Sequence, residues 1–82
     1  MRVDVFFVVG RETPGGVMFL QTYMAGNFRN KHWGYLEYAD RYLMFEDAKK
    51  AAENASRQYE SDEPAAVWRV EVTAAKEERS EN

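Results

Sequence analysis

A chain of 82 residues with a formal net charge of −3 can form one small domain, and it lacks the basic excess typical of general DNA-binding proteins. It contains no cysteine, which excludes disulfides, thiolate metal sites and a thiol nucleophile, and which fits a reducing compartment such as the cytoplasm. No segment approaches the roughly 20 apolar residues that a membrane-spanning helix needs. We therefore expect one cytoplasmic domain without a membrane anchor.

Two strands joined by a tight turn are predicted at the N-terminus. Residues 2–10 alternate with period two and are largely apolar on both faces, as in a central strand. Residues 11–15 contain Thr-Pro-Gly-Gly, which is typical of a turn. Residues 17–25 alternate again, so the economical interpretation is a hairpin whose second strand ends at Gly26 and Asn27.

The stretch between the second strand and the helix is less regular. Residues 28–33 interleave polar and aromatic side chains without a clear period, which indicates a loop, and residues 34–38 resume alternation, which indicates a short third strand. Asp40 could cap an early helix start, because its carboxylate can accept the free N–H groups of a first turn. Residues 42–45 fit either extended chain or the first helical turn.

The clearest periodicity lies in residues 45–59 and predicts an amphipathic helix. Its apolar side chains recur at steps of three and four and so share one face. That stripe consists of Phe45, Ala48, Ala52, Ala55 and Tyr59. Because the stripe is mostly alanine, the helix can lie close against a sheet. The helix is expected to end near Ser61, since the residue before Pro64 avoids the helical region.

Residues 66–73 alternate and predict a half-buried closing strand. Trp68 and the valines two and four positions after it are expected to face inward, with Trp68 buried on the sheet face that meets the helix. Arg69 and Glu71 are expected to face water.

These elements predict an α+β fold. We expect one mainly antiparallel sheet of about four strands with a single helix packed on one face, in the order β-β-β-α-β. The predicted domain spans residues 1–73, and residues 74–82 form a charged C-terminal tail.

Three short sequence motifs in the second half of the chain carry a resemblance to known proteins. They are Ala39-Asp40-Arg41-Tyr42, Glu46-Asp47-Ala48 and Val67-Trp68-Arg69-Val70-Glu71-Val72. The pattern resembles small phage-encoded accessory proteins, some of which inhibit bacterial defence systems. The chain departs from that pattern at Leu43 and Met44, where a polar helix cap is usual. The resemblance implies a fold type and a phage context, and it carries over no site.

Catalytic and metal-binding chemistry has little support in the residues present. His32 is the single histidine, and its neighbours Arg29, Asn30 and Lys31 supply neither a nucleophile nor an orienting carboxylate. With one histidine and no cysteine, a transition-metal site is not expected. The carboxylates lie where solvated carboxylates usually lie, at the helix ends and in the tail. We therefore expect no enzyme activity, no cofactor and no metal.

One stretch, the predicted loop 28–35, combines positive charge with flat aromatic faces. Trp, Tyr and Arg dominate protein-binding hot spots, and the same mixture suits base stacking with phosphate neutralisation. The expected partner-binding residues are Phe28, Arg29, Lys31, His32, Trp33 and Tyr35. The structural alternative is that Phe28 and Trp33 cover the open end of the core.

The function expected from the sequence is that of a small non-enzymatic binding module of phage or mobile-element origin. It would bind and block a host protein, with defence-system components among the candidates. The alternative is a nucleotide or single-stranded nucleic-acid binder that uses the same loop. A second alternative is a homo-oligomer, such as a homodimer, formed through a sheet edge or a spare apolar sheet face.

Overall fold

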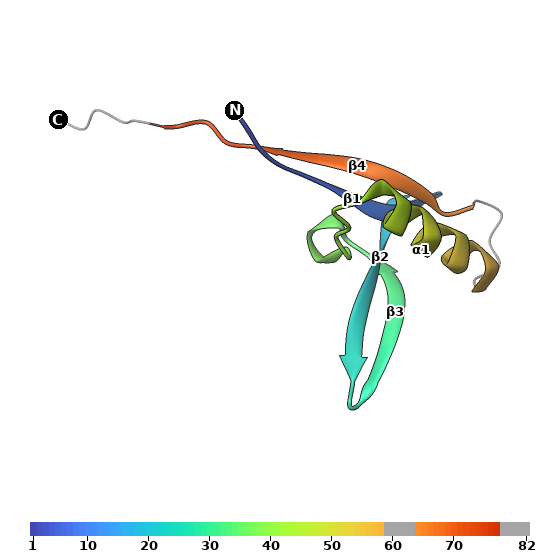
Figure 1. The fold of residues 1–82 in the computed structure, drawn as a ribbon. Helices are drawn as coiled ribbons and strands as arrows, with labels where there is room; N and C mark the ends of the chain where they lie inside the picture. The colour runs from blue at the N-terminus through green and yellow to red at the C-terminus, as the bar shows by residue number, and fades with distance from the viewer. Residues whose placement is uncertain (59–63, 78–82) are drawn as a thin grey trace.

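The computed structural model describes residues 1–58 and 64–77, which form one antiparallel sheet and one α-helix (Figure 1). The strands are β1 (Arg2–Thr13), β2 (Gly16–Ala25), β3 (Phe28–Gly34) and β4 (Ala66–Thr73). Helix α1 covers Phe45–Gln58, and a short 3-10 helix, η1, covers Leu36–Tyr38. The order across the sheet is β3-β2-β1-β4, so β1 is central as expected. The predicted α+β class and the β-β-β-α-β order are confirmed.

The sheet splits into two diverging parts. β1 pairs with β2 only from Gly10↔Phe19 to Thr13↔Gly16, next to the turn, whereas it pairs with β4 along Arg2–Gly10. Beyond Phe19, β2 turns away with β3 as a separate two-stranded ribbon (Figure 1). We call residues 21–32 of this ribbon the hairpin arm. The radius of gyration is 16.0 Å, against about 12 Å for a compact chain of this length, because the arm and the β1–β4 ribbon point in different directions.

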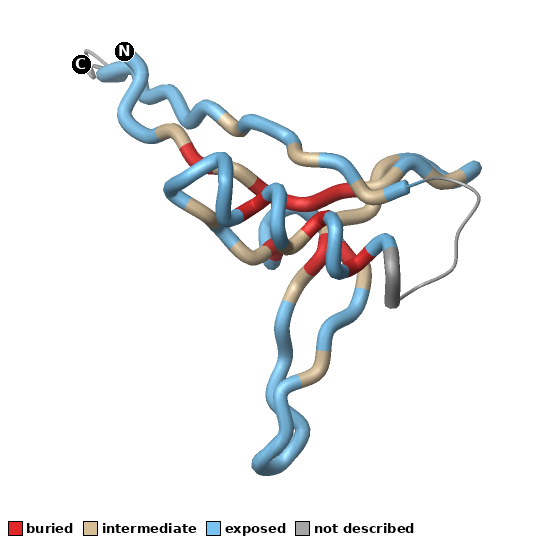
Figure 2. Tube along the Cα trace, turned by 45° about the vertical axis from the view of Figure 1, so that its right-hand side comes forward, coloured by how far each residue is buried: buried red, intermediate tan, exposed pale blue. Residues whose placement is uncertain are grey.

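Apolar residues are buried on both faces of the sheet at the junction of these two ribbons (Figure 2). The helix face, on which α1 packs, buries Val9, Leu20, Ala52 and Ala55, with Trp33, Tyr42, Ala51, Ala65 and Val67 partly buried against them. The opposite face buries Phe6, Val8 and Ala39, with Phe19 and Val70 beside them. Successive residues of a strand point to opposite faces, so β1, apolar on both, supplies both clusters.

The alanine stripe of α1 is buried as predicted. Ala48, Ala52 and Ala55 lie against the sheet, whereas Phe45 at the start of the helix is half exposed and contacts Phe7 edge-on, with ring centroids 5.9 Å apart. Tyr59, also assigned to the stripe, and the expected helix end near Ser61 lie outside the described residues. In the tail, residues 74–77 are neither helix nor strand, and the rest lies outside the described residues.

The predicted loop 28–33 and the predicted strand 34–38 are both wrong. Phe28–Gly34 form β3, which pairs with β2 from Leu20↔Trp33 to Ala25↔Phe28 around a turn at Gly26 and Asn27. Gly26 has a φ of 64°, and no non-glycine residue among those described has a positive φ, as in a type II′ hairpin turn. Because both faces of the hairpin arm are exposed to solvent, β3 carries no alternation of apolar and polar residues.

Trp68 lies on the face opposite α1, so the predicted orientation of β4 is wrong. Val67 is the residue that packs on the helix face, and strand alternation turns Trp68 to the other side. There its ring contacts Phe19 edge-on, with centroids 6.3 Å apart, and covers Gly10. Trp68 remains 37% exposed. The sheet buries apolar residues on both faces, and the apolar face of β4 belongs to the cluster opposite α1, so its alternation alone did not distinguish the face that meets the helix.

A larger side chain on the buried side of α1 should overpack the contact between α1 and the sheet. We expect Ala52→Leu to lower the free energy of unfolding by about 1–3 kcal/mol, because Ala52 is buried against the sheet. Glu53→Leu, at an exposed neighbouring position, should change it by no more than about 0.5 kcal/mol. Urea denaturation of both variants measures the difference, and equal losses would contradict the assignment of Ala52 to the buried side of α1.

The contact between Gly10 and Trp68 allows a test of the opposite face. A Cβ at Gly10 would lie 2.9 Å from Cδ1 and Nε1 of Trp68 and 3.0 Å from Cδ1 of Phe19, so Gly10→Ala must displace a ring. The substitution should therefore cost less stability in a Trp68→Ala background, with a coupling energy of about 0.5–3 kcal/mol. A double-mutant cycle by urea denaturation measures it. If Gly10→Ala lowered stability equally in both backgrounds, the Trp68 indole would not lie against Gly10.

Candidate functional site

The base of the hairpin arm is built by residues 39–42, which pass between β1 and β2 where these strands separate. On the β1 side, Tyr42 N–H donates to Phe7 O (2.8 Å) and Phe7 N–H donates to Tyr42 O (2.7 Å). On the β2 side, Asp40 N–H donates to Leu20 O (3.0 Å). Ala39 packs with the cluster on the opposite face, and Tyr42 packs on the helix face. The chain thus crosses from one face of the sheet to the other through this fork.

Asp40 fixes the arm to the fork with its carboxylate. Its Oδ1 accepts the Thr22 N–H (2.9 Å), and its Oδ2 accepts the Thr22 hydroxyl (2.6 Å). Oδ2 also forms an ion pair with Lys31 Nζ at 3.2 Å. Thr22 and Lys31 are paired across β2 and β3, so one side chain binds both strands of the arm. The proposed role of Asp40 as a helix cap is wrong, because α1 begins only at Phe45.

The six residues predicted to bind a partner are divided by strand pairing between the two faces of the ribbon. Arg29, Lys31 and Trp33 lie on the helix face, because Trp33 pairs with the core residue Leu20. Phe28 and His32 lie on the opposite face. The sixth residue, Tyr35, follows the strand and is exposed next to η1. The predicted set is therefore not one continuous surface.

Two of these residues have contacts within the molecule that account for their position. Trp33 is half-buried against the core on the helix face, and the Arg11 guanidinium carbon lies 5.0 Å from its ring centroid. This geometry is a cation–π contact. Lys31 is ion-paired with Asp40. Trp33 and Lys31 thus help to hold the arm at its base.

On the opposite face of the arm, His32 stacks on Tyr23. The ring centroids are 4.5 Å apart and the planes are inclined by 26°, an arrangement typical of offset aromatic stacking. Nε2 of His32 is also hydrogen-bonded to the side-chain amide of Gln21. Gln21 in turn covers Gly34, where a Cβ would collide with the side-chain amide of Gln21. His32 is therefore a strand residue held by its cross-strand neighbours.

The end of the hairpin arm displays apolar side chains to solvent. Phe28 is 74% exposed, and Tyr23 and Met24 are also exposed on the facing strand. Arg29 lies opposite Met24 and is exposed too. Exposed apolar groups of this kind mark interaction sites on soluble proteins. We call Tyr23, Met24, Phe28 and Arg29 the arm tip. Tyr23 and Phe28 lie on the opposite face and Met24 and Arg29 on the helix face, and the two pairs are brought together next to the turn that joins the strands.

A second group of exposed apolar residues was missed by the sequence analysis, except for Tyr35, which it had assigned to the predicted loop. It flanks the fork, on η1 and at the start of α1, and consists of Tyr35, Leu36, Tyr38, Leu43, Met44 and Phe45. Leu43 is 79% exposed, although it stands where a helix normally begins with a polar cap. The absence of a polar cap at Leu43 and Met44 was the sequence signal for this surface.

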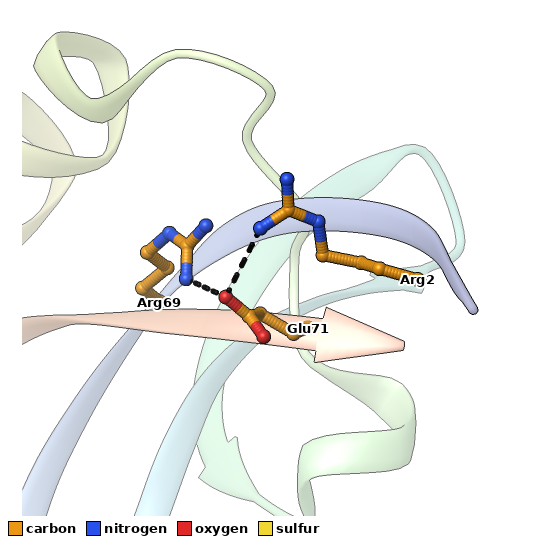
Figure 3. A network of polar contacts seen from close by, with 3 residues as sticks. All are labelled: Arg2, Arg69 and Glu71. Carbon is orange, nitrogen blue, oxygen red and sulfur yellow. Dashed lines mark hydrogen bonds and ion pairs between the residues drawn. The ribbon is translucent and has the colours of Figure 1, made fainter. Parts of the chain in front are cut away.

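An ion-pair network lies on the helix face of the β1–β4 ribbon (Figure 3). Oε1 of Glu71 accepts hydrogen bonds from Arg69 on the same strand and from Arg2 on β1, the latter at 3.4 Å. The hydrogen bond and charge of Arg69, with a smaller contribution from Arg2, lower the pKa of Glu71. Glu71 is therefore ionised throughout the neutral range.

Metal-ligand clusters and grooves are two further features that could form a site. Within residues 1–58 and 64–77, no group of three or more His, Asp or Glu side chains is placed to hold a metal ion. A groove of about 520 Å³ runs between α1 and the start of β4, and its lining combines Phe45, alanines and Val67 with Lys49, Glu53 and Ser56. Its hydroxyl group, Ser56 Oγ, accepts the Ala65 N–H at 3.1 Å. No helix in the described part of the chain is long and apolar enough to cross a membrane.

Comparisons of this chain with protein-family models, curated proteins and solved structures found no match.

The clamp at Asp40 can be tested by substitution. Asp40→Ala removes acceptors from Thr22 and Lys31 and should cost about 1–3 kcal/mol of unfolding free energy. Asp47→Ala, which removes an exposed carboxylate from the first turn of α1, should cost only about 0.3–1 kcal/mol. Urea denaturation gives the totals, and hydrogen exchange of the Thr22 amide should accelerate only in Asp40→Ala. A loss no larger than that of Asp47→Ala would show that Asp40 does not hold the arm.

Proposed function

We propose that the chain is a small binding module that acts by occupying a surface on another protein through its arm tip. The observation that carries the proposal is the hairpin arm itself, a two-stranded ribbon that extends from the sheet with apolar side chains exposed at its end.

The energetics of the arm support a bound partner. Two-stranded hairpins are marginally stable in water, since neither face is covered. Here the base is fixed by Asp40 and Trp33, whereas the tip residues pair with each other across β2 and β3. Burying Phe28, Tyr23 and Met24 in a partner would remove apolar surface from water, at roughly 25 cal/mol per Å². The fixed base lowers the entropy lost when the arm is held by a partner.

The chemistry of the tip favours a protein partner over nucleic acid. Tyrosine and arginine are enriched in protein hot spots, phenylalanine is enriched at interfaces, and all three are exposed around the short turn of the arm. Nucleic-acid binding depends on several cations that neutralise phosphates. In this arm Lys31 is paired with Asp40, and the chain has a net charge of −3. The resemblance to phage-encoded accessory proteins makes a bacterial host protein the expected partner, which the module would block.

The test is binding of an identified partner by a variant of the arm tip. Host proteins captured by the tagged chain are identified, purified and titrated against the wild type and against a Phe28→Ala/Arg29→Ala double variant. The double variant should bind at least about tenfold more weakly, because hot-spot truncations cost 1–2 kcal/mol or more. Its melting temperature should hardly change, since both side chains are exposed.

The matched control is Val3→Ala/Lys50→Ala, which also removes one exposed apolar group and one exposed cation, away from the arm. Its affinity should equal that of the wild type. Unchanged affinity of the arm-tip variant would overturn the proposal and direct attention to the surface around Leu43. Binding of single-stranded oligonucleotides that falls steeply with salt, without any captured protein, would favour the nucleic-acid alternative instead.

A further inference from the structure

Within residues 1–58 and 64–77, no strand pairs with the outer edge of β4, because β4 is the last strand in the order β3-β2-β1-β4. In an antiparallel sheet, alternate residues point both backbone groups to the same side. The backbone groups of Ala74 exchange hydrogen bonds with Met1 and so point toward β1. Phe7 lies opposite Arg69, but its N–H and C=O bond to Tyr42 on the side of β1 away from β4, so the backbone groups of Arg69 also point away from β1. Even-numbered residues of β4 therefore bond to β1. The outward-pointing N–H and C=O groups belong to Val67, Arg69, Glu71 and Thr73.

We propose that two copies of this chain pair antiparallel through their β4 edges, around a two-fold axis at Val70. Arg69 of each copy then lies opposite Glu71 of the other, and Val67 lies opposite Thr73. These are the residues whose backbone groups point outward, so each such pair can exchange two hydrogen bonds. The two sheets would become continuous across the axis. A two-fold axis requires a self-complementary surface, which this edge provides.

The charges on β4 select this register. Arg69 and Glu71 are the charged side chains on the helix face of the strand. With the axis at Val70, each arginine faces a glutamate, which stabilises a cross-strand pair. With the axis at residue 69 or 71, the backbone groups would still match, but two arginines or two glutamates would face each other across the axis. Like charges directly opposite are destabilising. Glu71 is ionised at neutral pH, so this discrimination operates there.

The opposite face adds apolar contacts in the same register. Trp68 of one copy lies opposite Val72 of the other, and the two Val70 side chains meet at the axis. Trp68 and Val72 are both more than a third exposed in the single chain. Aromatic and β-branched residues that face each other across strands stabilise the pairing of those strands. The second copy would thus cover apolar surface that one chain leaves in water.

The proposed dimer leaves the hairpin arm accessible. β3 forms the other edge of the sheet, so the arm and the β4 edge lie on opposite sides of the molecule (Figure 1). A dimer would display two arm tips. The inference does not depend on the proposed function, because it rests on β4 alone.

Analytical ultracentrifugation over a wide concentration range tests the dimer. The wild type should reach twice the 9.6 kDa mass of one chain. Glu71→Arg and Arg69→Glu each place like charges opposite each other at both symmetric contacts, and each should raise the dimer dissociation constant at least about tenfold. Glu37→Arg makes the same charge change at an exposed position in η1 and should leave the dimer intact.

Mixing the two variants separates loss of pairing from loss of folding. One variant then carries arginine at both positions and the other carries glutamate at both, so every cross-strand pair in a mixed dimer is again of opposite sign. The mixture should recover the dimer, with one chain of each kind, while far-UV circular dichroism confirms that each variant is folded. A monomeric wild type at all concentrations, dimers unaffected by either substitution, or a mixture that stays monomeric would each overturn the proposal.

Discussion

Hydrogen bonding at the fork between β1 and β2 is the constraint on which the rest of the structure depends. When two paired strands separate, each is left with backbone groups that need partners. Residues 39–42 supply these partners, with Tyr42 bonded to Phe7 on one side and Asp40 to Leu20 and Thr22 on the other. The same residues carry the chain from one face of the sheet to the other. The hairpin arm on one side and α1 on the other both begin from this crossing.

The cores are small, and their size explains the exposed surface. Each face of the sheet buries only a few residues, and α1 contributes alanine rather than large side chains. Where large side chains are absent, glycines allow neighbouring side chains to approach the backbone closely. The ring of Trp68 lies over Gly10, and the amide of Gln21 lies over Gly34. Large apolar residues remain outside the cores, at the arm tip, around the fork and along β4. Surfaces of this kind usually meet other molecules.

Two of these surfaces serve different roles in our proposals, and the sheet order keeps them apart. The arm tip belongs to the hairpin at one side of the sheet, and the β4 edge lies at the other. The arm tip has mixed aromatic and cationic chemistry, with no sign that it complements itself. The β4 edge, in contrast, places Arg69 and Glu71 symmetrically about Val70, so its complement is an identical strand. We therefore assign a foreign protein to the first and a second copy to the second.

The sequence alone determined those elements that local chemistry specifies. The alanine stripe of α1, the β-branched and aromatic run of β1 and the turn at Pro14 and Gly15 follow from local chemistry, and all are present. β3 could not be predicted by the same means, because solvent reaches both of its faces and the strand is set by pairing with β2. The side on which Trp68 lies was decided by the packing of α1 over Val67.

Only the tertiary structure decided the arrangement of the candidate site. The sequence indicated residues 28–35 as the binding stretch, and part of the arm tip lies there. Strand register, however, placed Phe28 and His32 on one face of the arm. It placed Arg29, Lys31 and Trp33 on the other. Asp40 was a plausible helix cap by its neighbours in the chain, yet its partners Thr22 and Lys31 lie 18 and 9 residues away. Local sequence fixes what a side chain can bind, whereas strand pairing and packing determine which groups come within its reach.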